Sequence, residues 1–496
     1  MPFPLSIHVV NKSNNTLHHT VPYAPPFPTS TLQEGHVTAR ASLISLTSNN
    51  LAYARLGSLW RWWSAYEVPS SLAAPYNDRE QYGIVPAWGY GLVLSSRVPG
   101  LEAGTQLWGF WPPNSMPVDL ELVPDKPAGH WRDVTDARSG MMSYYHRYQV
   151  ANLPGNISDL SREELEKVAW QTVFLPLFAC GYWTSQYVLG SEPVHPFGAP
   201  GGEWTKEDAD LSKAVVISLS ASGKTARAFT GTLFHSREPS TGPLGVLAVT
   251  SKPDAEWLTT DKLPSKAVAY ADATSDDTVE WIRGLTPERI VIVDFGGRAG
   301  SLDNLMITLK NSLPSASVKI IGIGGTATAM QSPSELAAFA KMAQMVERVQ
   351  MNTSSVRDAL FERYGAKAVF EELDEAWKGF EGRGFSKGLK LKVGRGAGGE
   401  DGFEGGWQVL CEGRADAVDG VVYRMDVGLL SIALSMNAEM QRGSCPSLFA
   451  AAQPHEAMTS SGLELPSKRR IRNMMTSRLF TVFYQLSNCQ ISEAIE

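Results

Sequence analysis

The feature that most constrains this chain is a predicted strand, turn and helix in its central part. The run Ala214–Leu219 (AVVISL) is almost entirely apolar, which is typical of a strand buried on both faces of a parallel sheet. Small residues follow in Ser220–Ala226 (SASGKTA), and a helix is expected to begin near Lys224. Such a turn lets the backbone approach a pyrophosphate while the helix presents its amide groups to the anion. The residues predicted to contact a dinucleotide here are Ser220, Ala221, Ser222, Gly223, Lys224 and Thr225.

Further apolar runs follow at a spacing that suits strands alternating with helices. They are Gly245–Ser251, Lys266–Asp272, Arg289–Phe295 and Ser317–Gly324. Connections long enough for a helix separate most of them. The pattern therefore predicts an α/β fold with a doubly wound, Rossmann-type parallel sheet.

The end of the second predicted strand indicates which dinucleotide binds. NAD sites usually carry an acid at this point to hold the ribose hydroxyls, whereas NADP sites accept the extra phosphate with neutral and basic groups. Here the strand ends in Thr250, Ser251 and Lys252. These three residues are predicted to bind the cofactor, and NADP is favoured. Lys224 would add a second cation near the phosphates.

The N-terminal part has the pattern of a small barrel. From Leu43 to Gly109, short β-prone runs alternate with Gly, Pro and Asn, as in a barrel or sandwich. Ser161, which precedes acidic residues, predicts the start of a helix. The uncharged run Val168–Gly190 is long enough to span a bilayer, but its polar residues and Pro176 indicate a buried helix.

The length of the chain, 496 residues, exceeds what one hydrophobic core usually serves. A GroES-like barrel or substrate domain is expected over 1–185 and 330–425, and a nucleotide-binding domain over 186–329. The tail, 426–496, is expected to be loosely ordered. We also expect a helix over 332–349 and, from its many glycines, a flexible loop over 394–406.

Charge and cysteine content exclude several classes of protein. The formal net charge of -7 argues against nucleic acid as the main partner, because phosphate binding needs a basic surface. The four cysteines lack CxxC spacing, so neither a disulfide framework nor a structural zinc site is indicated. The N-terminus lacks the basic start and apolar run of a signal peptide. We therefore expect a cytoplasmic protein with a small-molecule substrate and no membrane partner.

Several segments resemble the medium-chain dehydrogenase/reductase superfamily. The stretch Tyr82–Phe110 is similar to its barrel segment, SASGKTA to its Gly-rich turn, and Ile292–Gly297 (IVDFGG) to its fourth strand. More closely, NNLAYARLG, PAWGYG and VVISLSASGKTA are similar to a family of fungal and bacterial proteins known only as a domain of unknown function. That resemblance runs from about Ser42 to Met425.

The superfamily resemblance implies a GroES-like barrel, a cleft between barrel and sheet, and hydride transfer from NAD(P)H. It is also compatible with a homodimer. Where zinc-dependent members carry Gly-His-Glu, this chain has Gly89, Tyr90 and Gly91. The resemblance is therefore to the zinc-free, quinone oxidoreductase-like members, and no metal is expected.

A zinc-free reductase needs another proton donor, and a tyrosine hydroxyl can serve. Tyr66 lies roughly where enoyl-thioester-reducing relatives carry such a tyrosine, and Tyr90 replaces the ligand histidine. Both are candidate catalytic residues, with packing of the barrel as the alternative for each. The expected activity is an NADPH-dependent, zinc-free reduction of an enone, enoyl or quinone-like small molecule, of the kind found in secondary metabolism.

Two alternatives stay open. Lys224 and Ala226 stand where the superfamily's turn usually has a small residue and a glycine. The same fold could therefore host a cofactor-independent isomerase, cyclase or C–C bond-cleaving enzyme. The chain could also be a catalytically silent binding protein that uses its barrel and the basic stretch Lys468–Arg470.

Overall fold

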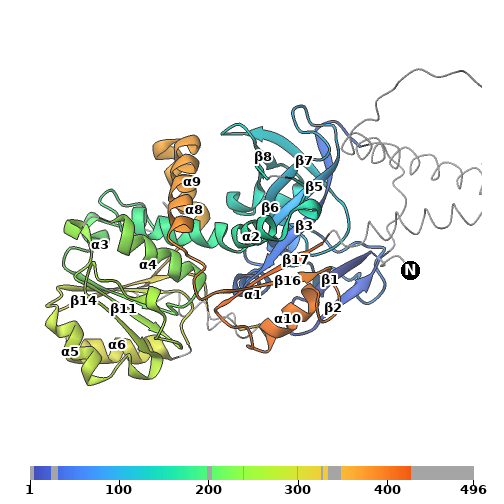
Figure 1. Cartoon of the computed structure of the whole chain (residues 1–496). Coiled ribbons are helices and arrows are strands. Elements are labelled where there is room, and N and C mark those ends of the chain that lie inside the picture. Colours follow the sequence, from blue (N-terminus) through green and yellow to red (C-terminus); the bar gives the residue numbers. More distant parts are fainter. Residues whose placement is uncertain are drawn as a thin grey trace, which may run out of the picture. The chain divides into compact units, whose positions relative to one another are not determined.

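The structure is a computed structural model that describes residues 5–23, 32–153, 155–197, 204–237, 239–298, 300–325, 328–332, 334 and 348–425. Its main parts are a closed barrel and a parallel sheet with helices on both faces (Figure 1). The predicted α/β class, with a GroES-like barrel and a Rossmann-type sheet, is confirmed. The predicted tail, 426–496, lies outside the described residues.

The parallel sheet has the strand order of a dinucleotide-binding fold. Its order is β12-β11-β10-β13-β14-β15, so the first strand along the chain lies in the middle of the sheet. The strands are β10 (Ala214–Leu219), β11 (Gly245–Thr250), β12 (Ser265–Ala269), β13 (Arg289–Asp294), β14 (Ser317–Gly322) and β15 (Arg348–Gln350). All neighbouring pairs are parallel.

Helices cover this sheet on both faces, which explains why its strands are apolar throughout. Alternate residues of β10, such as Val216, face a core shared with α4 (Lys224–Ser236). The other residues, such as Val215 and Ile217, face a core shared with α5 (Asp276–Gly284) and α6 (Ser301–Ser312). Because water reaches neither face, no polar alternation is required.

The sixth strand, β15, was not predicted. Arg348 and Val349 were expected to end a helix, but both belong to β15, which pairs with β14. The helix prediction is therefore wrong at its C-terminal end. A buried ion pair between Arg348 and Asp294 holds the segment in the sheet. The residues next to Arg348 in the sequence do not predict such a contact. The residues from 335 to 347 lie outside the described part of the chain.

The barrel closes through six antiparallel strands. The ring runs β3-β5-β6-β9-β8-β7, and β7 pairs with β3 to close it. Its strands are β3 (His36–Leu46), β5 (Ala87–Ser96), β6 (Gln106–Trp111), β7 (Val118–Asp125), β8 (His130–Asp133) and β9 (Arg147–Val150). A smaller sheet, β2-β1-β4, contains β1 (Ser6–Asn11), β2 (His18–Pro22) and β4 (Tyr82–Gly83).

Sequence from the end of the described chain extends the barrel sheet. The strand β17 (Asp419–Arg424) pairs antiparallel with β3, and β16 (Lys390–Arg395) pairs parallel with β17. The helix α10 (Phe403–Cys411) connects them. The loop predicted over 394–406 is therefore wrong at both ends, because strand pairing fixes its start and burial of Phe403 fixes its end. Two further helices, α8 (Thr353–Tyr364) and α9 (Ala366–Gly382), precede β16.

The helix α2 (Arg162–Trp183) links the barrel core to the sheet core. Its predicted start is confirmed, since the Ser161 hydroxyl accepts the Glu164 amide in a capping box. The uncharged run is a buried helix, as predicted, and continues into a π-turn over Thr184–Val188. At Gly181 a Cβ atom would lie 2.6 Å from the Thr225 carbonyl oxygen. The absent side chain therefore sets how closely α2 approaches α4.

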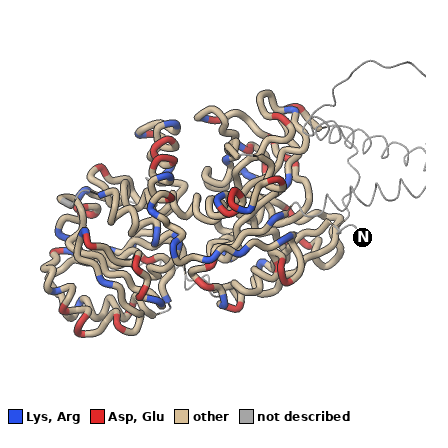
Figure 2. Tube along the Cα trace, in the orientation of Figure 1, with Lys and Arg blue, Asp and Glu red and all other residues tan. Residues whose placement is uncertain are grey.

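Charges of both signs are mixed along the described trace (Figure 2). Among the described residues, no helix combines the length and the apolarity needed to cross a membrane.

Candidate functional site

A cavity of about 2500 Å³ lies where the carboxyl ends of the sheet strands meet residues of the barrel region. From the sheet it is lined by Ser220, Phe295, Ile323 and Gln350, which follow or end four different strands. From the barrel region and α2 it is lined by Tyr53, Trp88, Tyr144, Tyr145 and Cys180. The carboxyl ends of the strands in an open α/β sheet are where ligands bind.

The turn after β10 has the geometry expected of an anion site. Ser220 has a left-handed conformation with φ of 60°, and the Ala221 amide donates to the Val249 carbonyl at 3.0 Å. The helix α4 begins at Lys224, and no side chain caps its N-terminus at Gly223. Its first amide groups are therefore available to an anionic ligand.

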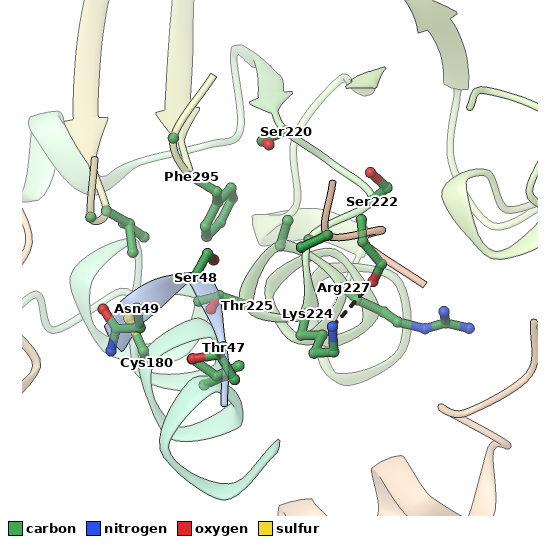
Figure 3. A pocket seen from close by; sticks show the side chains of 18 of the residues that line it. Thr47, Ser48, Asn49, Cys180, Ser220, Ser222, Lys224, Thr225, Arg227 and Phe295 are labelled. Atoms are coloured by element: carbon green, nitrogen blue, oxygen red, sulfur yellow. Dashed lines mark hydrogen bonds between the residues drawn. The ribbon is translucent and has the colours of Figure 1, made fainter. Parts of the chain in front are cut away.

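Most of the predicted cofactor residues line this cavity. Ser220, Ser222, Gly223, Lys224, Thr225, Ser251 and Lys252 do so, and Figure 3 shows the side chains of several of them. Ala221 and Thr250 do not line it, and both are fully buried. The cofactor assignment of all nine residues stays a prediction.

The two predicted cations already have partners. The Lys224 ammonium donates to the Ala417 carbonyl at 3.1 Å, and burial lowers the pKa of Lys224 to about 8. The Lys252 ammonium lies 2.6 Å from the Asp416 carboxylate. The acid that the second strand lacks is thus supplied by a loop 164 residues further along the chain.

Arg227 is a cation of this site that sequence analysis missed. Its side chain lines the cavity beside Lys224 (Figure 3) and is only 4% exposed. Its Nη2 donates to the Lys387 carbonyl at 2.6 Å, and its guanidinium carbon lies 4.1 Å from the centre of the Trp257 ring. Its Nη1 has no hydrogen-bond partner among the described residues. The only sequence signal was a basic residue in the first turn of the helix.

A buried ion pair fixes the backbone at the end of β13. The Arg348 Nη1 atom lies 2.9 Å from one carboxylate oxygen of Asp294. The other oxygen accepts the amides of Gly296 at 3.1 Å and Gly297 at 2.8 Å. Both glycines line the cavity. The pair therefore holds a side-chain-free stretch of backbone where a ligand can approach closely.

The opposite wall contains a tyrosine pair, Tyr53 and Tyr145. The Tyr53 hydroxyl oxygen accepts from Asn49 Nδ2 at 2.7 Å and from Trp88 Nε1 at 2.9 Å. It also shares a hydrogen bond with Tyr145. Burial raises the pKa of Tyr53, while the bonds from Trp88 and Tyr145 act in the opposite direction. Two donors that point at one phenolic oxygen stabilise negative charge there.

Neither predicted catalytic tyrosine lines the cavity. The Tyr66 hydroxyl donates to the Phe110 carbonyl at 2.7 Å and lies 2.8 Å from the Tyr148 hydroxyl inside the barrel. The Tyr90 hydroxyl lies 3.5 Å from Gln171 Oε1, in the core shared with α2. The catalytic role of both stays a prediction from the sequence. Sequence analysis missed Tyr53, and the signal that could have indicated it is its i, i+4 spacing from Asn49 in NNLAY.

The same wall offers little for covalent or metal chemistry. Burial raises the pKa of the Cys180 thiol to about 11, so it is not a thiolate near neutral pH. Within the described ranges, no group of three or more His, Cys, Asp or Glu side chains is placed to hold a metal ion.

The residues present fit a dinucleotide. An uncapped helix N-terminus, the fixed backbone of Gly296 and Gly297, and a buried arginine with a free nitrogen share one cavity. These are donors suited to phosphate groups.

Comparisons with solved structures find similar folds at low identity. A mutant form of enoyl thioester reductase from Candida tropicalis has a TM-score of 0.46 and 10% identity, over 85% of this chain and 100% of that chain. CurA from Vibrio vulnificus, in complex with NADPH, has a TM-score of 0.42 and 11% identity, over 84% and 98%. A mycobacterial protein complexed with NADPH has 0.43 and 13%, over 85% and 99%. At this degree of similarity these structures bear on neither substrate nor mechanism.

No curated protein matches the chain. A family model described as "Protein of unknown function (DUF2855)" matches residues 44–416, well over half of the chain. The predicted resemblance to a family of unknown function is thereby confirmed, and the chain belongs to the DUF2855 family.

Proposed function

We propose that the protein is an NADPH-dependent reductase of a conjugated small molecule, such as an enone, an enoyl compound or a quinone, and that it works without zinc. The observation that carries this proposal is the composition of the cavity. One wall offers an uncapped helix end and cations, and the other offers an aromatic surface with the Tyr53–Tyr145 pair.

The sheet side would hold the cofactor through its phosphates. The first residues of α4 line this space without a side-chain cap, and Gly296 and Gly297 present backbone without side chains. When bound, NADPH supplies the hydride. Phe295 lines the cavity between these two stretches, so apolar surface is available to exclude water there.

The barrel side would supply the proton. Hydride addition to a conjugated carbonyl leaves an enolate, which needs one proton to complete the reduction. The Tyr53 oxygen accepts two N–H groups and shares a hydrogen bond with the Tyr145 hydroxyl, so a proton can pass between the two phenols. Proton loss from the pair leaves a phenolate that Asn49 and Trp88 stabilise. Tyr145 is the less buried member of the pair and is the one that would meet the substrate.

The aromatic wall favours a flat, conjugated substrate. Trp88 and Tyr144 rings lie 5.1 Å apart, and the Trp88 and Tyr145 rings 5.6 Å apart. Such surfaces bind planar π-systems by stacking and dispersion. The cavity offers them beside the proton donor, which is the arrangement that reduction of a conjugated double bond requires.

Titration of the purified full chain with NADPH and NADH, followed by nicotinamide fluorescence, tests the proposal. We expect saturable binding of NADPH, followed by its oxidation on addition of an enone, an enoyl thioester or a benzoquinone. If neither NADPH nor NADH binds, the proposal is overturned.

One observation favours a second candidate, a cofactor-independent isomerase, cyclase or C–C bond-cleaving enzyme. Lys224 and Lys252 are tied to the loop that contains Asp416 and Ala417, and that loop lines the same cavity. This arrangement suits a cavity that works without nucleotide. Turnover that persists after exhaustive removal of nucleotide would support this candidate against the reductase.

A further inference from the structure

Arg227 is a buried cation that has no counter-charge within the described ranges of the chain. Among the described residues, no carboxylate lies within ion-pair distance of its guanidinium, and Nη1 lacks any hydrogen-bond partner. Burial lowers the pKa of Arg227 to about 10, with no opposing contribution from an acid. Buried charges in proteins are ordinarily paired, because an unpaired one loses its hydration without compensation.

The surroundings of Arg227 hold its guanidinium in place. Trp257 lies against one face of the group, and the Lys387 carbonyl accepts from Nη2. A carbonyl and a ring orient a guanidinium without neutralising it. The remaining nitrogen is therefore a buried donor without a partner among the described residues, on a side chain that lines the cavity. A planar guanidinium suits the oxygens of a phosphate group.

The neighbouring lysines show why this arginine matters. Lys252 pairs with the Asp416 carboxylate, and Lys224 donates to a carbonyl. A ligand phosphate would have to displace Asp416 to use Lys252. Arg227 needs no such displacement. It lies one helical turn beyond Lys224, and its ring partner Trp257 follows the strand end where a dinucleotide's ribose is expected.

We propose that Arg227, held by Trp257, forms a subsite for a phosphate monoester in this cavity. This inference rests on the proposed function for the identity of one source of that group, the 2′-phosphate of NADPH. The other source is a phosphate carried by the substrate.

Isothermal titration of the full chain with three small probes tests the subsite. The probes are adenosine 2′,5′-bisphosphate, adenosine 3′,5′-bisphosphate and 5′-AMP. All three carry a 5′-phosphate, and they differ in whether a second phosphate lies on the 2′ oxygen, on the 3′ oxygen or on neither. The variants are Arg227→Gln and Arg227→Lys, with Lys252→Gln as the paired-cation control and Lys213→Gln as an exposed control. Thermal unfolding without ligand shows that each variant is folded, and Arg227→Lys serves if the glutamine variant is not.

We expect wild type to bind the 2′,5′-bisphosphate more tightly than 5′-AMP. Arg227→Gln should lower the affinity for the 2′,5′-bisphosphate by roughly 10- to 100-fold, the usual loss for a hydrogen bond to a charged group. The affinity for 5′-AMP should stay unchanged. Arg227→Lys should lie between, because a lysine keeps the charge without the planar fork. Lys252→Gln should have a smaller effect, because the Lys252 ammonium is already paired with the Asp416 carboxylate.

If the loss falls on the 3′,5′-bisphosphate instead, the subsite stands and its phosphate belongs to the substrate. Equal binding of all three probes by wild type and Arg227→Gln overturns the inference. The two proposals fail separately. If substitution of Arg227 leaves NADPH binding unchanged, the reductase proposal stands and the subsite is ruled out. If bisphosphate binding depends on Arg227 but neither NADPH nor NADH binds, the subsite stands and the reductase proposal is ruled out.

Discussion

Two polar aromatic clusters in the barrel region differ in where their hydroxyl groups point. The interior cluster joins Tyr66, Tyr148, Arg138 and Asp133, and the Arg138–Asp133 pair at 2.9 Å is almost fully buried. The cavity cluster joins the tyrosine pair to Asn49 and Trp88. In the interior, the hydroxyls end on the Phe110 carbonyl. In the cavity cluster, both tyrosines line a space where a ligand can bind. The same residue type therefore stabilises the fold in one cluster and is placed for chemistry in the other.

The largest expected effect is on stability and comes from the interior cluster. Arg138→Met leaves the Asp133 carboxylate buried without its cation. We expect the free energy of unfolding, measured in urea, to fall by about 3–5 kcal/mol. Lys213→Met breaks an exposed pair with Glu288 and serves as the control, with no measurable change expected. Equal stability of the two variants would contradict the structural role of this cluster.

The next effect is on rate and comes from the cavity cluster. Tyr53→Phe removes the hydroxyl that receives the Asn49 and Trp88 donors. In a single-turnover reduction, the rate constant should fall by about 10²- to 10⁴-fold, with little change in NADPH affinity. If Tyr53→Phe reduces the substrate at the wild-type rate, the Tyr53–Tyr145 pair is not the proton donor.

Asn49→Ala should have a smaller effect on the same step. It deletes one of the two N–H donors to the Tyr53 oxygen and keeps the tyrosine. We expect the rate constant to fall by roughly 10-fold, in line with loss of one hydrogen bond to a charged group. The solvent isotope effect on reduction should rise, because proton transfer becomes more rate-limiting. A structural role alone would leave that isotope effect unchanged.

The smallest effects are expected from the tyrosines that the sequence singled out. Tyr66→Phe leaves the Phe110 carbonyl bonded to Tyr148, so unfolding should cost about 1 kcal/mol less and reduction should be unaffected. Tyr90→Phe, with its long 3.5 Å contact, should change neither. Loss of reduction in either variant would restore the sequence-based assignment and displace the Tyr53–Tyr145 pair.

Much of the fold could be predicted because its signals are local. Three of these signals involve residues that are close together in the sequence: the apolar run of β10, the small residues that follow it and the capping box at Ser161. β15 was missed because its three residues depend on the distant partner Asp294.

The site could be predicted only in outline for the same reason. Most residues of the predicted turn and strand end line a cavity, and their role in binding a cofactor stays a prediction. What the sequence could not reveal is that Asp416 meets Lys252, or that Arg227 has no acidic partner within the described part of the chain. Nor did it single out Tyr53, which is the one aromatic residue in NNLAYARLG, whereas Tyr66 closes the aromatic stretch WRWWSAY. These distinctions depend on partners far away in the chain.

The close approach of α2 and α4 at Gly181 limits how this protein can be re-engineered. A methyl group there would meet the Thr225 carbonyl oxygen and the Phe229 amide nitrogen, 2.6 and 2.8 Å away. Leu177, one turn earlier on α2, lines the cavity. The shape of the cavity can therefore be changed at Leu177, whereas any side chain at Gly181 would push away the helix α4. One helix thus carries both a tunable position and a fixed one.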